Sequence, residues 1–276
     1  MKNSRQSIVE KFKKKDRICN ICQLEKELSE DHVPPQACPP AKNTVISKLF
    51  YQMIGERGFR PRMSQNGVSY KTICSDCNNK LGNRYDWALG DFSQKIESFV
   101  GSSVILPDSF EVECYPNAIM RSVLGHLLAA KTETDEVVID TVVRPSILDP
   151  SLPIPDDIHI FYWVYPYETI SILRDFAMPA VRGNLQTSGF FNMIKFYPIA
   201  FLITHQLPSY EKLLSLHQFN QLPSGDKANL QIDLRPIKRS TWPEECLGEE
   251  NFLVVGRAAN DSVYAVPKLK KIKNHS

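Results

Sequence analysis

The stretch SEDHVPPQACPP, residues 29–40, joins an acid and a histidine to a proline-rich continuation. Two consecutive prolines cannot donate the hydrogen bonds of a sheet, so a strand that carries His32 must end there and become a loop. In an extended strand, neighbouring side chains point to opposite faces. Asp31 and His32 can therefore serve one site only if the strand bends or the site lies at its tip, which the turn at Pro34 and Pro35 allows.

Two Cys-x2-Cys pairs flank this stretch, Cys19/Cys22 before it and Cys74/Cys77 after it. Four thiolates on two short turns are the donor set of a tetrahedral zinc site, and a site with all four positions filled by cysteine is structural. In a reducing compartment such pairs favour a metal over disulfides. The 51 residues between the pairs exceed the usual spacing of a zinc ribbon, so an insertion is expected. The remaining cysteines are interpreted as buried small hydrophobes: Cys38, Cys114 and Cys246.

The residues between and after the pairs suggest chemistry. A neutral imidazole accepts a proton near physiological pH, and a carboxylate such as Asp31 binds hard divalent cations. A second metal ligand must come from another element, and Asn78 or Asn79 stands directly after Cys77, where a helix is expected to begin. A zinc ion on both pairs would clamp the strand to this helix. The alternatives are an asparagine that caps the helix and a histidine with a purely structural role.

The order Cys-x2-Cys, Asp-His-x-x-Pro, Cys-x2-Cys-Asn resembles the HNH nuclease family, at CNIC, EDHVPP and CSDCNNKLG within residues 19–82. The resemblance implies a ββα-metal core, in which a two-stranded hairpin packs on a helix and a four-cysteine zinc ion staples them. It also implies that His32 is the general base and that Asp31 and Asn78 bind a catalytic Mg²⁺ or Mn²⁺ ion. One departure is that the family's asparagine before the second pair falls near Ser69, for which Asn66 is only an approximate substitute.

The implied reaction is hydrolysis of phosphodiester bonds in nucleic acid, with DNA as the favoured substrate. His32 would deprotonate a water molecule for in-line attack, and the metal would stabilise the charge that develops on the phosphate. Basic side chains near the motifs are expected to hold the phosphate backbone as a patch, although each alone is more often a solvated charge. They are Arg57, Arg60, Arg62, Lys71, Lys80 and Arg84.

The N-terminal part of the chain is basic, whereas the remainder is slightly acidic. Residues 1–103 contain 17 Lys and Arg against 11 Asp and Glu, whereas the remainder contains 16 against 20. We expect an α+β protein with a nuclease domain over 1–103 and a strand-rich α+β domain over 104–276. The second domain would serve regulation, recognition or the binding of a partner protein or a second copy of the chain.

Hydrophobic periodicity predicts the elements. A helix is expected over 43–56, as the insertion, and a strand leads into Cys74. Helical sequence then runs from Asp76 onward, with a break near Gly82 or Gly90. Asp86 is interpreted as a carboxylate on the helix surface, and the alternative is that it reaches the metal. The second domain is expected to contain a helix over 117–131, capped by Asn117, with His126 as a packed core residue. Strands are predicted at 110–116, 137–143, 158–165, 190–204, 229–237 and 251–256.

The expected cellular location is inferred from two kinds of segment that are not recognised in the sequence. Its apolar runs fall short of the roughly 20 residues of a membrane-spanning helix, and no secretory signal is recognised, so a cytoplasmic protein without a membrane partner is expected. HNH nucleases of this layout are found in bacterial restriction and phage-defence systems, an analogy at family level. The alternative is a catalytically inactive, zinc-stapled nucleic-acid-binding or adaptor protein. The presence of Asp31, His32 and Asn78 together favours the enzyme.

Overall fold

The computed structural model describes residues 12–40, 44–49, 61–102, 105–177, 190–235, 237–244 and 256–268. Near the N-terminus, β1 (Leu28–His32) pairs antiparallel with β4 (Ser69–Cys74) in a two-stranded sheet, and α3 (Ser75–Leu81) begins at once after β4. The predicted strand into Cys74 and the helix that follows it are thereby confirmed. The order strand, strand, helix is the arrangement that the candidate site requires.

The helical path after α3 contains one irregular turn. A π-helical turn, η2 (Gly82–Asp86), connects α3 to α4 (Trp87–Val100) without interrupting the helical path, so the break predicted near Gly82 or Gly90 is instead a π-helical turn at Gly82. A π-helical turn inserts an extra residue into an α-helix and is frequent at functional sites. Here Tyr85 and Asp86 are buried within that turn. The interpretation of Asp86 as a surface carboxylate is therefore wrong.

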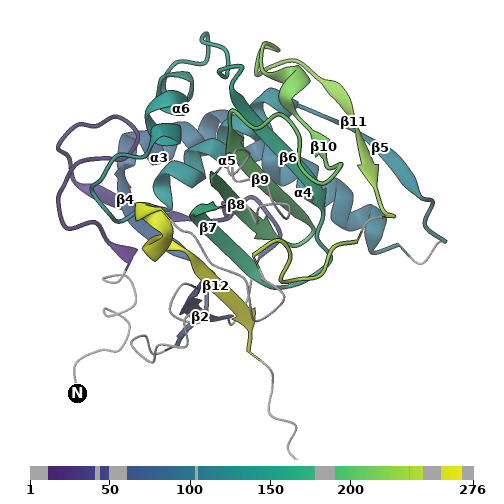
Figure 1. Cartoon of the computed structure of the whole chain (residues 1–276), viewed down its shortest axis with the longest axis horizontal. Helices are drawn as coiled ribbons and strands as arrows, with labels where there is room; N and C mark the ends of the chain where they lie inside the picture. The colour runs from purple at the N-terminus through teal and green to yellow at the C-terminus, as the bar shows by residue number, and fades with distance from the viewer. Residues whose placement is uncertain are drawn as a thin grey trace, which may run out of the picture.

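An eight-stranded antiparallel sheet forms the centre of the described structure (Figure 1). Its spatial order is β10-β6-β9-β8-β7-β12-β2-β3, so strands from both ends of the sequence lie side by side. A separate two-stranded sheet pairs β5 (Ser109–Cys114) with β11 (Ala228–Asp233). The central strands are β2 (Thr44–Lys48), β3 (Arg62–Ser64), β6 (Ile158–Val164), β7 (Ile170–Ala177), β8 (Phe190–Phe196), β9 (Ile199–His205), β10 (Leu214–Ser215) and β12 (Val263–Pro267).

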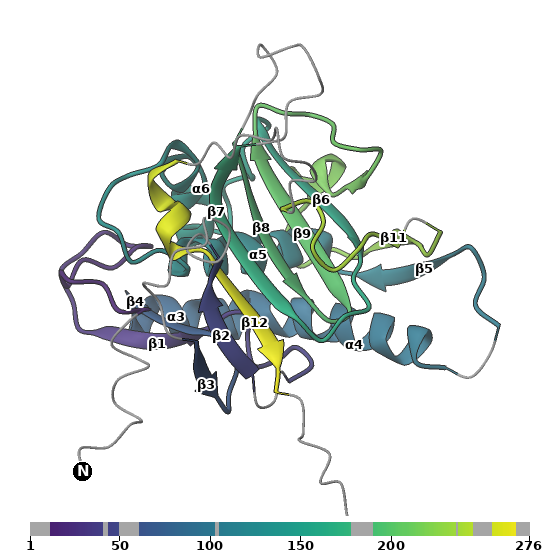
Figure 2. The same cartoon turned by 60° about the horizontal axis from the view of Figure 1, so that its bottom comes forward.

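Helix α5 (Pro116–Ala129) is the main internal element: all of its residues are buried. It passes behind β8 and β9, between the sheet and the segment that contains α3 and α4 (Figure 2). It begins with proline at its first turn, which costs no hydrogen bond there, so Asn117 is not its cap. The amide of Asn117 instead donates to the carbonyl oxygens of Phe219 and Asn220. The opposite face of the sheet carries a second, aromatic-rich core that includes Phe161.

Two predicted elements are wrong. Residues 44–48 of the expected helix instead form strand β2, in which alternate residues such as Thr44 and Ile46 point inward. Short apolar runs with β-branched residues suit a strand as well as a helix. Residues 50–56 of the expected helix lie outside the described part. The strand predicted at 137–143 is instead helix α6 (Val138–Leu148), since Ile139, Val143 and Ile147 recur every four residues on its buried side. Of the strand predicted at 251–256, only Gly256 is described.

The hydrophobic core runs across the predicted domain boundary at 103/104. Ile73 and Leu81 from the first segment belong to the same buried cluster as Leu124 of α5. Strand β2 pairs with β12 near the end of the chain. The α+β class is confirmed, and the two-domain division stays a prediction. None of the helices in the described part has both the length and the apolar character that a membrane crossing requires.

Candidate active site and metal centre

The four paired cysteines converge on one point. The sulfur atoms of Cys19, Cys22, Cys74 and Cys77 all lie within 4.8 Å of one another, and the Cys22 and Cys74 Sγ atoms are 3.9 Å apart. Zinc–sulfur bonds of about 2.3 Å place tetrahedral sulfur ligands about 3.8 Å from each other. The cluster is therefore compatible with a structural zinc ion, as predicted.

The surroundings of the cluster favour thiolates. The backbone N–H of Cys74 donates to the Cys19 Sγ atom at 3.3 Å. The pKa of Cys19 is lowered to about 4, mainly because it accepts a hydrogen bond from Cys77, and the thiolate is the form that binds metal. Cys38 and Cys114 are buried free cysteines outside the cluster, as predicted. Cys246 lies outside the described residues.

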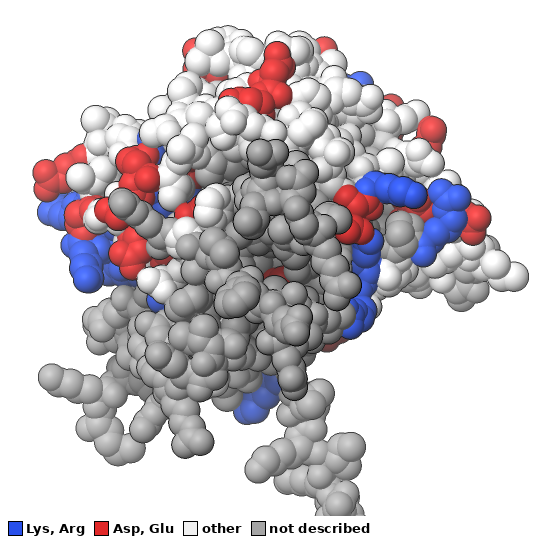
Figure 3. Space-filling model, in the orientation of Figure 1, with Lys and Arg blue, Asp and Glu red and all other residues white. Residues whose placement is uncertain are grey.

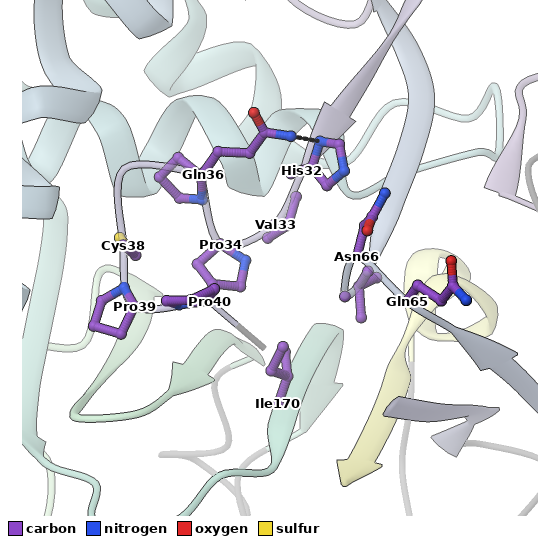
Figure 4. Close-up of a pocket in the computed structure, with 13 residues that line it drawn as sticks. His32, Val33, Pro34, Gln36, Cys38, Pro39, Pro40, Gln65, Asn66 and Ile170 are labelled. Atoms are coloured by element: carbon purple, nitrogen blue, oxygen red, sulfur yellow. Dashed lines mark hydrogen bonds between the residues drawn. The ribbon is translucent and has the colours of Figure 1, made fainter. Parts of the chain in front are cut away.

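His32 ends β1 on the solvent side of the strand. It lines a cavity of about 360 Å³ whose other walls are proline rings, aliphatic groups and neutral amides (Figure 4). His32 is partly exposed, and its Nδ1 atom lies 3.3 Å from Nε2 of Gln36. Asn66, the approximate substitute for the family's asparagine, also lines this cavity.

The Gln36 contact governs which ring nitrogen of His32 carries a proton. With the amide nitrogen toward Nδ1, that ring atom is the acceptor and Nε2 holds the hydrogen. A rotation that exchanges the amide oxygen and nitrogen of Gln36 places an acceptor there and frees Nε2 as a base. The side-chain amide of Gln36 is exposed and not otherwise hydrogen-bonded among the described residues, so both arrangements are accessible.

Asp31 points to the other face of β1, into the interior. Its Oδ2 atom lies 2.8 Å from Nδ1 of His126 on α5, and Nε2 of His126 lies 3.0 Å from Oδ1 of Asp86. The hydroxyl of Ser122 donates to the same Asp86 oxygen at 2.7 Å. We call Asp31, His126 and Asp86 the site cluster. Asp31 and His32 thus alternate across the strand, so they do not share one face.

Both ring nitrogens of His126 face carboxylate oxygens, and only an imidazolium can donate from both. Burial lowers the pKa of His126, but Asp31 and Asp86 raise it by more, so that it lies well above its usual value. Burial likewise raises the pKa of Asp86, and the charge and hydrogen bond of His126, with that of Ser122, bring it below its usual range. The prediction of a packed His126 is correct for burial and missed this pairing, which no local spacing signals.

Asn78 connects α3 to β1. Its Nδ2 atom donates to the carbonyl oxygen of Glu30 at 2.9 Å and lies 3.3 Å from the Ser29 hydroxyl. Because a carbonyl only accepts, the amide oxygen of Asn78 must face the other way, and it has no hydrogen bond among the described residues. Asn78 does not cap α3, whose N-cap is Cys74 without a side-chain bond. Asn79 is exposed.

The residues predicted to hold a catalytic ion have suitable donors. Asn78 offers an amide oxygen, and Asp31 offers its second carboxylate oxygen beside the one that His126 holds. Oxygen donors of this kind suit Mg²⁺ and Mn²⁺, and Mg²⁺ commonly keeps several waters and takes few protein ligands. Asn78 bonds the backbone of the residue next to Asp31, so both donors belong to the same end of the hairpin.

The basic residues are only partly described. Lys80 and Arg84 are exposed on α3 and η2, and Lys71 is half-buried on β4. Arg62 lies on β3, while its side chain and the whole of Arg57 and Arg60 fall outside the described part. On the face shown in Figure 3, basic and acidic side chains stand next to each other at both flanks, and neither sign covers a continuous area of the described surface.

No family model, no curated protein and no solved structure matches the chain. The geometry of the site joins a zinc-compatible cysteine cluster, a partly exposed imidazole beside a cavity, and two oxygen donors held by hydrogen bonds from the interior.

Proposed function

We propose that the chain is a metal-dependent endonuclease of the HNH type, which hydrolyses phosphodiester bonds in nucleic acid, with DNA as the favoured substrate. The observation that supports it most is the ββα arrangement itself. The cysteine cluster joins the start of β1 to the start of α3, His32 stands at the tip of β1, and Asn78 bonds β1 from α3.

His32 acts as the general base in this proposal. Its partial exposure lets it reach a water molecule, and the cavity beside it gives a substrate room to approach. Gln36 holds the ring, and the orientation of its amide with the oxygen toward Nδ1 leaves Nε2 free as the base. General-base catalysis of this kind contributes about 10²- to 10⁴-fold to a rate.

Asp31 and Asn78 would hold the divalent cation, which when bound supplies stabilisation of the charge on the phosphate and on the leaving oxygen. The chain's part is to fix these donors. His126 holds one oxygen of Asp31, and the Glu30 carbonyl holds the amide nitrogen of Asn78. Lys80 and Arg84 are exposed on the same helical path and would contact phosphates without reading sequence.

The wider setting is proposed by analogy alone. An HNH nuclease with this layout suits the effector of a bacterial phage-defence or restriction system, in the cytoplasm, with a partner protein or a second copy bound through residues 104–276. The second candidate function is an inactive, zinc-stapled nucleic-acid-binding or adaptor protein. One observation favours it: Asp31 is only 3% exposed and already shares an oxygen with His126.

A plasmid-cleavage assay with Mg²⁺ or Mn²⁺ distinguishes the two. We expect nicking or linearisation by the wild type and a loss of about 10²-fold or more in His32→Ala. His205→Ala is the matched control, because His205 is also a partly exposed histidine hydrogen-bonded to one side chain, Asp157. Equal cleavage by wild type and His32→Ala would refute the assignment of the base. No cleavage by a folded wild type that still retards DNA in a gel would favour the adaptor.

A further inference from the structure

We propose that His126 is a positioning residue of this active site: it orients Asp31 for the divalent cation, so that helix α5 belongs to the catalytic unit. The inference rests on the proposed function only in taking Asp31 as a metal ligand. It assigns a role to a residue 95 positions away from Asp31, beyond the boundary of the predicted nuclease domain.

The geometry leaves Asp31 little freedom. One carboxylate oxygen is fixed at 2.8 Å by Nδ1 of His126, and the ring of His126 is fixed in turn at 3.0 Å by Asp86. Ser122 fixes Asp86. His126 is 1% exposed and Asp31 3%, so water does not compete for these bonds. A ligating carboxylate held by outer hydrogen bonds is a recurring feature of metal sites, and loss of such a partner costs about 10- to 100-fold in metal affinity or activity.

The second carboxylate gives the cluster its charge. His126 and Asp31 alone would form a neutral pair with little attraction for a cation. Asp86 adds a negative charge on the far side of the ring, so the three side chains together carry one net negative charge. The side chain of Asp86 is 12% exposed and that of Asp31 is 3% exposed, so burial does not choose between the two ends. The second oxygen donor assigns the cation to Asp31, because Asn78 bonds the backbone of the residue next to Asp31.

Helix α5 is anchored to the site by bonds other than those of the cluster. Asn20, in the first cysteine turn, donates to the carbonyl oxygens of Leu128 and Lys131 at 2.9 and 2.6 Å. Thr72 on β4 donates to that of Ala129 at 2.5 Å. The end of α5 therefore moves together with both the cysteine cluster and the hairpin, which keeps His126 in register with Asp31.

The test measures Mn²⁺ binding to the full-length, zinc-loaded protein without nucleic acid, by calorimetry or by the electron paramagnetic resonance of free Mn²⁺. We expect His126→Gln to raise the Mn²⁺ dissociation constant about 10- to 100-fold, and Asp31→Asn to raise it at least as much. In cleavage assays, His126→Gln should need more Mn²⁺ for half-maximal rate, should recover at high Mn²⁺, and should keep the wild-type KM for DNA. Recovery by metal is not expected of a merely misfolded variant.

Ser122→Ala is the second variant, since it removes one hydroxyl from Asp86 and leaves the ring in place; we expect a few-fold weakening of Mn²⁺ binding. If His126→Gln does not fold, Mn²⁺ binding by Ser122→Ala alone tests the positioning role of His126.

Unchanged Mn²⁺ binding in folded variants, or a wild type that binds no Mn²⁺ through Asp31, would overturn the positioning role. A wild type that cleaves DNA while His126→Gln binds Mn²⁺ normally refutes this inference alone. A wild type whose Mn²⁺ binding is weakened by Asp31→Asn and by His126→Gln, but which does not cleave nucleic acid, refutes the proposed function alone.

Discussion

Two regions of the molecule each bury a group of charged side chains, and the groups differ in how completely they are neutralised. The site cluster lies between the hairpin and α5, and its two carboxylates flank one imidazole. On the aromatic face of the central sheet, Nζ of Lys195 lies 2.6 and 2.8 Å from the two oxygens of Glu244. We call the latter the sheet pair.

The sheet pair is surrounded by further hydrogen-bond partners. Nζ of Lys195 also donates to the carbonyl oxygens of Ser240 and Trp242, and the hydroxyl of Ser171 lies 3.2 Å from Glu244. Its two charges cancel, and the side chains are 0% and 5% exposed. The site cluster instead keeps one negative charge, and it ends at Asp31, on the face of β1 opposite to His32. A neutral, saturated pair has a structural role, whereas a cluster with surplus charge has a carboxylate oxygen left for a cation.

The largest expected effect is that of removing zinc, which should destabilise the hairpin of the site cluster and leave the central sheet folded. Removal of zinc with a strong chelator, or Cys77→Ser, should unfold the hairpin and the cysteine turn, since structural zinc sites contribute on the order of 10 kcal/mol. Hydrogen exchange should then show lost protection in β1 and β4 well before β8 and β9, which the sheet core holds. Cys114→Ser, at a buried cysteine outside the cluster, is the control and should leave protection of β1 intact. Equal protection of β1 with and without zinc would contradict the structural role.

The next effect concerns the sheet pair. Lys195→Met should lower the free energy of unfolding by about 3–5 kcal/mol, because it leaves the Glu244 carboxylate buried without its partner. The double variant Lys195→Met/Glu244→Leu should recover most of this loss, since apolar residues of similar size replace buried ion pairs at little cost. Urea denaturation measures both.

The same variants sharpen the comparison with the site cluster. Mn²⁺ binding by the folded Lys195→Met protein should equal that of the wild type, because the sheet pair carries no surplus charge toward the site. A sheet-pair variant that stays folded and loses Mn²⁺ affinity would show that the two regions are coupled.

The parts of the fold that sequence predicts here are those whose signal is local. The spacing of Cys74 and Cys77, the end of a strand at two prolines, and the alternation in β4 each lie within a few residues, and the structure contains the corresponding cluster, strand end and strand. Strand β6 is predicted in the same way, and the segment 190–204 is correctly predicted as extended, because both are apolar and rich in β-branched and aromatic residues. The structure divides that segment into the antiparallel strands β8 and β9.

What could not be predicted depends on distant partners. His126 pairs with Asp31 across 95 residues, and neither side of that contact has a pattern that points to the other. Asp86 was misjudged because an α-helical register does not anticipate the π-helical turn that buries it. Residues 44–48, predicted as helix, form a strand, and residues 138–143, predicted as strand, belong to a helix. Short apolar runs rich in valine and isoleucine fit both periods until a sheet edge or a packing face decides.

The smallest expected effect tests the packing contact between α5 and α3, next to the site cluster. A Cβ atom on Gly125 would lie 2.4 Å from Cδ2 of Leu81, so Gly125→Ala should push α5 away from α3 and lower the free energy of unfolding by about 1–2 kcal/mol. Leu81→Ala in that background should cost less than Leu81→Ala in the wild type. Gly82→Ala is the control: its Cβ would meet nothing closer than 4.0 Å and its φ is −55°, so its stability should be unchanged or slightly raised.

Because Gly125 precedes His126, the displaced helix should also weaken Mn²⁺ binding a few-fold, which the control should not. If Gly125→Ala lowers stability and leaves Mn²⁺ binding as it is, α5 supports the hairpin only by packing. If both change together, and both recover in the double variant with Leu81→Ala, the close approach of α5 to α3 is what holds the surplus charge of the site cluster in place.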